Sequence, residues 1–191
     1  MDGFDQHEAK GAERNAGGAF TVDMEVMTLP TVDGLRFVAV GQDDDLAEPL
    51  MAELAVEYAT RYGNTTENVT AWLRGYPAAE FAAPAGGMLI GVLDGTPVTG
   101  GAFRRFDERT AELKRIWTDS AYRRRGLGRT LLLALEAEIA NRGYHRVYLT
   151  TGDRQPEAEA LYLAAGYTRL TEPLPAEGDV YPIAFLKELQ P

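Results

Sequence analysis

The sequence predicts an α/β domain, of the α+β kind, in which a mixed sheet packs against helices. The predicted elements come in the order strand, two helices, three strands, helix, strand, helix and strand, and the run of three strands is antiparallel. The length of 191 residues suits one domain, which buries about 70% of its unfolded surface. Hydrophobic residues make up 45% and charged residues 25% of the chain, as in ordinary globular proteins.

The N-terminal region begins with few large apolar residues. Residues 1–20 are small, charged and rich in Gly and Ala, and predict a flexible tail before a domain over 21–191. Alternating apolar residues indicate an extended segment over 21–29. The turn Asp33-Gly34 then leads into a strand over 35–40.

Two helices are predicted next. Three acids at 43–45 supply a cap and match the dipole of a helix over 45–62, which Gly63 ends. Its apolar residues recur every four positions: Leu46, Leu50, Leu54 and Tyr58. The sequence Asn-Thr-Thr-Glu at 64–67 resembles a capping box for a short second helix. The Pro-, Gly- and Ala-rich stretch 75–87 predicts a long loop.

A run of three strands follows, over 88–93, 98–106 and 111–118. Asp94-Gly95 is a hairpin turn signal between the first two strands. In the second strand, Gly100-Gly101 indicates a bulge or a close approach. The remaining elements are a helix over 130–141, a strand over 146–151, a helix over 156–165 and a last strand over 180–186.

The turn over 122–129 joins the third of those strands to the next helix. Four of its residues are arginines: Arg123, Arg124, Arg125 and Arg129. A helix N-terminus carries a partial positive charge and N–H groups without partners, so cations are unfavourable there unless an anion binds. A phosphate or pyrophosphate resolves this conflict, and Gly126 and Gly128 let the backbone approach it. The alternative is an exposed loop whose arginines only add solubility.

The net charge favours a local anion site over general anion binding. The chain has 19 Lys and Arg against 29 Asp and Glu, a formal net charge of −10, so we expect no nucleic-acid partner. The turn lacks the Gly-Lys-Ser/Thr of a P-loop and the third glycine of a dinucleotide fingerprint.

Composition also excludes several kinds of site. The absence of Cys removes disulfides and a thiol nucleophile, and it suits a cytoplasmic protein. His7 and His145 lie far apart, so neither a Ser-His-Asp triad nor a metal site is expected. No apolar run reaches membrane-spanning length and the N-terminus lacks the apolar core of a signal peptide, so we expect no membrane partner.

Four motifs in chain order carry a resemblance to a known family. They are Ala-Glu-Leu-Lys-Arg-Ile-Trp-Thr at 111–118, Arg123-x-x-Gly126-x-Gly128, Gln155-x-x-Ala158-x-x-Leu161-Tyr162, and Gly166-Tyr167. The stretch from 88 to 167 resembles the GNAT-type N-acetyltransferase superfamily, and it is similar to actinobacterial members of unassigned substrate. The resemblance implies a single-domain GNAT-like fold with a central mixed, mostly antiparallel sheet and helices on both faces.

The same resemblance implies acetyl-CoA as the donor and an amine as the acceptor. Glu112 matches the strand glutamate that acts as general base, and Tyr162 matches the tyrosine that protonates the leaving thiolate. Alternation along the strand puts Glu112, Lys114, Ile116 and Thr118 on one face. The alternatives are a surface Glu112 paired with Lys114 or Arg115 and a core Tyr162, as in a non-catalytic acyl-CoA-binding or regulatory module.

The implied cofactor-binding residues lie in three places. Backbone groups of Ile116, Trp117 and Thr118 pair with the pantetheine amides like an added strand, and a backbone N–H there holds the thioester oxyanion. The turn binds the pyrophosphate through Arg123, Arg124, Arg125, Gly126, Leu127, Gly128, Arg129 and Thr130. Gln155 stands where Asn is commoner, and its side chain is one methylene longer.

The acceptor is expected to be a cationic small-molecule or peptide amine, because the acidic chain attracts cations. Trp72, Tyr76 and Phe81 are expected to shape its pocket, with an ordinary core role as the alternative for Trp72. The last strand is a natural contact for a homodimer.

Overall fold

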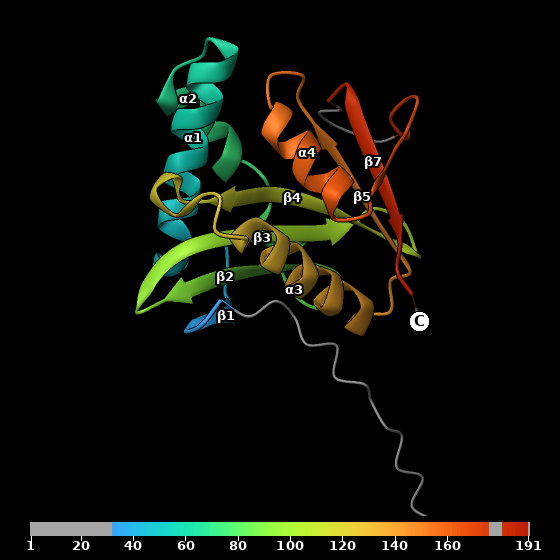
Figure 1. Cartoon of the computed structure of the whole chain (residues 1–191). Coiled ribbons are helices and arrows are strands. Elements are labelled where there is room, and N and C mark those ends of the chain that lie inside the picture. Colours follow the sequence, from blue (N-terminus) through green and yellow to red (C-terminus); the bar gives the residue numbers. More distant parts are fainter. Residues whose placement is uncertain (1–31, 176–180, 191) are drawn as a thin grey trace, which may run out of the picture.

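One seven-stranded sheet forms the centre of the described chain, which is residues 32–175 and 181–190 of the computed structural model (Figure 1). Its strands lie in the order β1-β2-β3-β4-β5-β7-β6. Their bounds are Leu35–Ala39 (β1), Gly87–Leu93 (β2), Thr96–Arg105 (β3), Thr110–Thr118 (β4), Arg146–Thr151 (β5), Thr168–Arg169 (β6) and Ile183–Glu188 (β7). β4 and β5 run parallel, and every other neighbouring pair is antiparallel, which confirms the mixed, mostly antiparallel sheet.

Helices cover both faces of this sheet, also as expected (Figure 1). The helices are α1 (Glu48–Tyr62), α2 (Thr66–Arg74), α3 (Leu127–Asn141) and α4 (Pro156–Ala164). One buried cluster joins α1 and α2 to the sheet, with Leu50 and Trp117 among its members. A second joins α3 and α4 to the opposite face through residues such as Leu135 and Tyr162. Burial of these apolar faces is the main force that holds the layers together.

Local sequence signals set several of the helix ends. The Asp44 carboxylate accepts a hydrogen bond from the Leu46 N–H at 2.9 Å, in a 3-10 turn (Asp45–Ala47) that precedes α1. Thr65 caps α2 by accepting from the Asn68 N–H at 3.2 Å. Gly63 ends α1 at φ 67°, a left-handed conformation that favours Gly. The predicted capping residues therefore act as caps.

The structure differs from the sequence-based expectations at four element boundaries. The stretch 75–87 contains a 3-10 turn (Ala78–Phe81), because Phe81 is buried in the core under α2. α3 begins at Leu127 rather than residue 130, so part of the arginine turn is its first helical turn. β6 was not predicted, since two residues carry no periodicity. The last strand is shifted to Ile183–Glu188. The predicted segments 1–20 and 21–29, and Val180, lie outside the described residues.

A bulge interrupts β4 at the place where the two glycines of β3 predict an irregularity. Gly100 pairs with Trp117 and Ala102 pairs with Lys114, so one residue of β3 faces two residues of β4. The extra residue is Arg115, whose φ is 58°. The bulge reverses the side-chain alternation beyond it. The expected common face of the strand is therefore wrong: Glu112 and Lys114 lie on the α1 face, whereas Ile116 and Thr118 lie on the α3 face.

β4 and β5 separate soon after they pair. They are in register only over Thr110–Glu112 and Arg146–Tyr148, and the later residues of both strands have no ladder between them. The separation leaves backbone groups of β4 unpaired on one side within the sheet. Both large cavities of the described structure lie at this opening.

Candidate functional site

Two cavities meet where β4 and β5 diverge. The first, of about 490 Å³, lies under α1 and α2. The second, of about 470 Å³, extends along the end of β4 to the arginine turn. Both cavities have four lining residues in common: Ile116, Gln155, Ala158 and Tyr162. The two cavities are therefore neighbours, and Tyr162 lies at their junction, on the wall that they share.

The arginine turn presents an uncapped helix start to the second cavity. Gly126 is the N-cap of α3 at φ 82°, no side chain caps the first turn, and that turn contains no acidic residue. A Cβ added at Gly128 would lie 3.2 Å from Leu161 Cδ2, so this glycine lets the backbone face the cavity closely. An uncapped helix start, its dipole and nearby cations are the features that an anion site requires.

The predicted residues of the turn divide into two groups. Lining the second cavity are Arg123, Arg124, Gly126, Leu127, Gly128 and Arg129. Arg125 and Thr130 do not line it. The Arg125 guanidinium lies over the Tyr122 ring at 5.1 Å, and the Thr130 hydroxyl donates to the Gly126 carbonyl at 3.2 Å. Both residues therefore hold the shape of the turn.

The end of β4 forms the opposite wall of the second cavity. Ile116, Trp117 and Thr118 all line it. The Trp117 indole donates to Glu53 at 2.9 Å, and the Thr118 hydroxyl lies 3.0 Å from that of Thr99. These contacts fix the strand end while its free backbone edge faces the opening.

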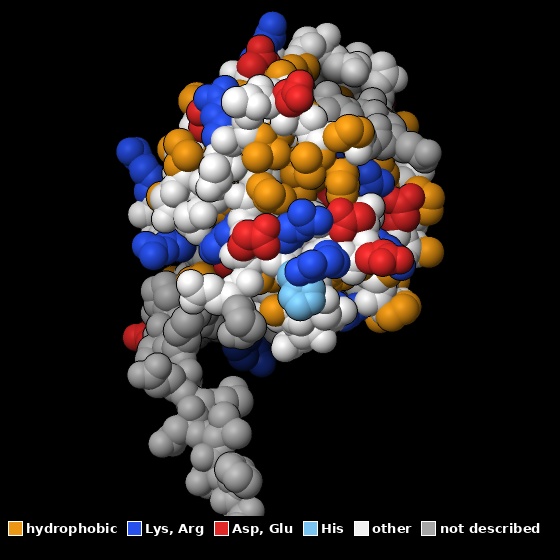
Figure 2. All heavy atoms as spheres, turned by 90° about the vertical axis from the view of Figure 1, so that its right-hand side faces the viewer, with side chains coloured by type: hydrophobic (Ala, Val, Ile, Leu, Met, Phe, Trp, Pro, Cys, Tyr) orange, Lys and Arg blue, Asp and Glu red, His pale blue; other side chains and the backbone are white. Residues whose placement is uncertain are grey.

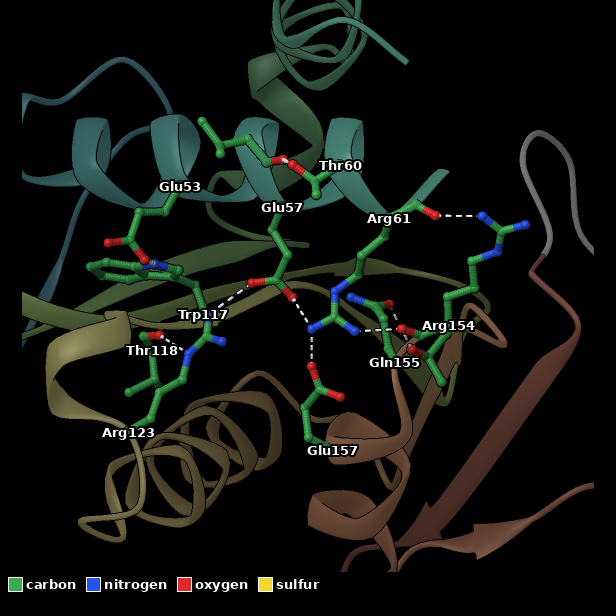
Figure 3. Close-up of polar contacts among 12 residues, drawn as sticks. Glu53, Glu57, Thr60, Arg61, Trp117, Thr118, Arg123, Arg154, Gln155 and Glu157 are labelled. Carbon is green, nitrogen blue, oxygen red and sulfur yellow. Dashed lines mark hydrogen bonds and ion pairs between the residues drawn. The ribbon is translucent and has the colours of Figure 1, made fainter. Parts of the chain in front are cut away.

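Ion pairs from α1 cross the second cavity (Figure 3). Arg123 Nη2 lies 2.7 Å from Glu57 Oε2, and Arg123 Nε donates to the Thr118 carbonyl at 3.1 Å. Arg61 of α1 pairs with Glu157 at the start of α4 and donates to the Arg154 carbonyl. Burial works against ionisation of Glu157, but its own backbone N–H and Arg61 together lower the pKa of this carboxyl.

These pairs leave three cations of the turn, Arg124, Arg125 and Arg129, without a counter-charge among the described residues, and the first and last of them line the second cavity. Glu57 balances Arg123. Within 32–175 and 181–190, no carboxylate lies within 4.0 Å of the guanidinium of Arg124 or Arg129. Both line the second cavity, so they are the charges most available to an incoming anion.

Tyr162 is buried at the junction of the cavities. Its ring packs against Tyr167 at 5.8 Å and Phe185 at 5.6 Å between centroids, and the residue is 6% exposed. Burial raises the pKa of its hydroxyl above the ordinary value of 10.0. The hydroxyl therefore keeps its proton at neutral pH and can donate it. Tyr162 is therefore a core residue that also lines both cavities, and its role as a general acid stays a prediction.

Glu112 lies behind the first cavity rather than on its wall. Its Oε1 is 2.7 Å from Lys114 Nζ and its Oε2 is 2.8 Å from Arg104 Nε. Arg104 also pairs with Glu80 at 2.6 Å. The anticipated pairing with Lys114 is present, but the residue is 3% exposed and is not a surface glutamate. Lys114, which lines the first cavity, stands between Glu112 and the opening.

Seven aromatic residues are among those that line the first cavity. Trp72, Tyr76 and Phe81 line it, as expected for residues that shape a pocket. Sequence reasoning did not identify three further tyrosines: Tyr58, Tyr62 and Tyr181. Tyr62 lies against Gly152, where an added Cβ would fall 1.7 Å from its hydroxyl. Gly152 is the one feature of the sequence that indicates this close contact with Tyr62.

The charges on the first cavity differ from those of the whole chain. Its charged lining residues are Lys114 and Arg115, and no described carboxylate lines it. The expectation of a cationic acceptor rested on the net charge of −10. The local charges do not favour such an acceptor. Gln155 is held by the Thr151 hydroxyl, which lies 3.0 Å from its Oε1.

Other expected partners have no assigned surface. The face at the end of the sheet formed by β7 and β6 mixes hydrophobic side chains with charges of both signs (Figure 2). A homodimer through this edge stays a prediction.

In the described ranges, no group of three or more acidic or His side chains is placed to hold a metal ion. None of the helices described has the length and apolar character needed to cross a bilayer.

A family model described as the Acetyltransferase (GNAT) family matches residues 50–167, more than half of the sequence. The chain belongs to the GNAT acetyltransferase family. Among curated proteins, no significant match was found. GNAT membership makes the chain a transferase by family.

Solved GNAT structures share the fold. A putative acyl-CoA N-acyltransferase from Klebsiella pneumoniae is 26% identical, with a TM-score of 0.64 over 82% of this chain and 98% of that one. A GNAT acetyltransferase from Elizabethkingia anophelis with acetyl-CoA bound is 16% identical (TM-score 0.55, 82% and 99% covered). The PaiA N-acetyltransferase of Thermoplasma acidophilum, in complex with coenzyme A, is 17% identical (TM-score 0.62, 81% and 99% covered). The latter two support the fold alone.

Proposed function

We propose that this GNAT chain is an N-acetyltransferase that moves an acetyl group from acetyl-CoA to a primary amine by direct attack. The observation that carries the proposal is the junction of the two cavities at Tyr162. One cavity offers an anion site for the cofactor, and the other offers a space of about 490 Å³ for an acceptor. A cytoplasmic location, inferred from the absence of Cys, belongs to the same proposal.

The second cavity suits the phosphate end of acetyl-CoA. Arg124, Arg129 and the free N–H groups of the α3 start bind the pyrophosphate. The open edge of β4 at 116–118 pairs with the pantetheine amides, as an added strand would. Arg123 takes part once it exchanges Glu57 for a phosphate oxygen. Two solved structures of the same fold contain acetyl-CoA or coenzyme A, which supports this choice of cofactor.

The residues at the junction then have distinct roles. The amine nitrogen forms a bond to the thioester carbon while the carbon–sulfur bond breaks. A backbone N–H at the end of β4 stabilises the oxyanion, and Tyr162 donates its proton to the departing sulfur. Glu112 accepts the amine proton through water, because Lys114 separates it from the cavity.

A second function is a non-catalytic acyl-CoA-binding module on the same fold. The observation in its favour is that both Glu112 oxygens are engaged by cations, so neither is free to take a proton. Such a module binds the cofactor and transfers nothing.

Two measurements test these functions. Thermal unfolding with acetyl-CoA at about 100 times its Kd is expected to show about 2.7 kcal/mol of stabilisation, a rise of roughly 5–10 °C for a domain of this size. Thiol release with a panel of amines then separates the enzyme from the module. An unchanged melting temperature at millimolar acetyl-CoA would contradict both functions, whereas binding without thiol release would leave the module.

The Glu112→Gln variant tests the proposed base. We expect kcat/KM to fall about 100-fold, because proton removal from the attacking amine is lost. Acetyl-CoA binding should stay within about threefold, since Glu112 does not line the second cavity. Steady-state kinetics over pH 6–9, with melting temperature as a check on folding, measure both. Wild-type kinetics in this variant would remove Glu112 from the mechanism but leave the enzyme class intact.

A further inference from the structure

Arg115 is a buried cation that faces the first cavity without a counter-ion. The residue is 7% exposed, and it lines the cavity. In the part of the chain that the structure describes, no carboxylate lies within 4.0 Å of its guanidinium. An unpaired buried charge is costly, so its retention at a cavity wall indicates a ligand of opposite charge.

The surroundings hold this guanidinium rigidly. Nη1 donates to Gln42 Oε1 at 2.7 Å and Nη2 donates to the Leu73 carbonyl. The guanidinium carbon lies 4.3 Å from the Phe81 ring centroid and 5.9 Å from that of Tyr76. Burial is the main reason that its pKa falls to about 10, so the group stays charged at neutral pH. The β4 bulge, at a strained φ of 58°, is what turns this residue to the cavity.

The cluster behind the cavity has an excess of one positive charge. Arg104 and Lys114 share Glu112, and Arg104 also binds Glu80. Two cations and two carboxylates thus balance each other, and Arg115 adds a cation. A single carboxylate on the ligand neutralises this excess, whereas a phosphate monoester with a charge near −2 exceeds it.

We propose that the acceptor is an amine that carries one carboxylate and an aromatic or aliphatic group, the chemistry of an apolar α-amino acid. The carboxylate binds at Arg115 and Lys114, the apolar group packs among the aromatic rings, and the amine points to the junction at Tyr162. A cavity of about 490 Å³ is in the range of small-molecule sites. This inference rests on the proposed acetyl transfer and names its substrate class.

A matched pair of ligands isolates the carboxylate. N-acetyl-L-phenylalanine and N-acetyl-2-phenylethylamine are the products of two amines that differ only in that group. We expect N-acetyl-L-phenylalanine to bind at least about tenfold more tightly than N-acetyl-2-phenylethylamine, as measured by calorimetry. With the two amines as substrates, we expect kcat/KM for L-phenylalanine to be at least about tenfold higher than for 2-phenylethylamine. Equal binding of the two products would overturn the inference, whatever the activity. A binding preference without any thiol release would instead overturn the proposed enzyme function alone.

Variants test the assigned cations. In Arg115→Met and in Lys114→Met the preference for the carboxylate, measured as the ratio between the two products in binding and between the two amines in kcat/KM, should shrink about tenfold or more, with little change in acetyl-CoA binding. Two variants are used because loss of the Gln42 and Leu73 contacts can unfold Arg115→Met. Arg36→Met is the control, since it removes an exposed cation from β1. A preference that survives in both cavity variants, or that falls equally in the control, would overturn the assignment.

Discussion

A Gly128→Glu substitution is expected to abolish binding of acetyl-CoA. The glycine lies in the first turn of α3 and lines the second cavity. It lies in the sequence between Arg124 and Arg129, the two arginines of this cavity that have no counter-charge. A glutamate there would place its carboxylate where the pyrophosphate binds and would pair with Arg124 or Arg129. We expect Kd to rise at least about 100-fold, or about 2.7 kcal/mol, and the thermal shift at millimolar acetyl-CoA to disappear.

The variant itself should stay folded. The new Cβ is tight only against the end of the flexible Leu161 side chain, at 3.2 Å, and its distance of 3.8 Å to Thr118 Oγ1 is an ordinary contact. An acid in the first turn of a helix is also favourable for the dipole. Ala137→Glu is the control, because it adds the same carboxylate to an exposed position of the same helix. A Gly128→Glu protein that keeps the full thermal shift would mean that the anion site lies elsewhere.

The sequence predicted the arginine turn because its signal is local. Cations at a helix start conflict with the dipole over a few residues, and the conflict is visible without a structure. The caps at Asp44, Thr65 and Gly63 were predicted for the same reason. Tyr162 was assigned from a motif, and its position at the junction of two cavities gives that assignment a physical basis.

Features that depend on distant partners could not be predicted in this way. One extra residue in β4 reverses the side-chain alternation. Neither the periodicity of apolar residues nor the composition reveals which of the two strands contains the extra residue. Glu112 also pairs with Arg104, which lies opposite it on β3 and is eight residues away, in addition to the neighbour that alternation suggests. The contacts of Glu57 and Arg61 across the second cavity join segments 66 and 96 residues apart. Their residue types alone indicate only a solvated helix face.

The charges that line the first cavity differ in sign from the net charge of the whole chain, and this is the most instructive difference between sequence and structure. The net charge of −10 belongs to the whole surface and governs long-range attraction. Short-range recognition depends instead on the groups that line the cavity, and those are Lys114 and Arg115. The net charge therefore governs the long-range attraction of ligands, whereas the side chains that line the cavity determine which ligand binds.

The Tyr162→Phe variant tests the proposed general acid. We expect kcat to fall about 100-fold, because the thiolate leaves without a proton donor. KM for acetyl-CoA should change by less than about threefold, since the phenyl ring keeps the contacts with Tyr167 and Phe185. Steady-state thiol release, with single-turnover measurements to isolate the chemical step, gives both constants.

The pH dependence adds a second readout for the same residue. Burial raises the pKa of the Tyr162 hydroxyl above 10.0, so the acid stays protonated up to and beyond that pH. In the wild-type protein, kcat/KM should therefore rise as the amine loses its proton, with no descending limb below pH 10. A descending limb near neutral pH that vanishes in Tyr162→Phe would contradict the raised pKa.

The matched control is Tyr167→Phe. It removes a hydroxyl from a neighbouring buried tyrosine that lines neither cavity. If loss of a buried hydroxyl acts only through packing, both variants should lower kcat equally. If Tyr162 protonates the sulfur, the rate of the chemical step should fall in Tyr162→Phe and not in Tyr167→Phe. An acceptor whose nitrogen has a lower pKa should not restore that rate in Tyr162→Phe. Near-normal kcat in Tyr162→Phe would assign the proton to water and leave Tyr162 as a wall between the cavities.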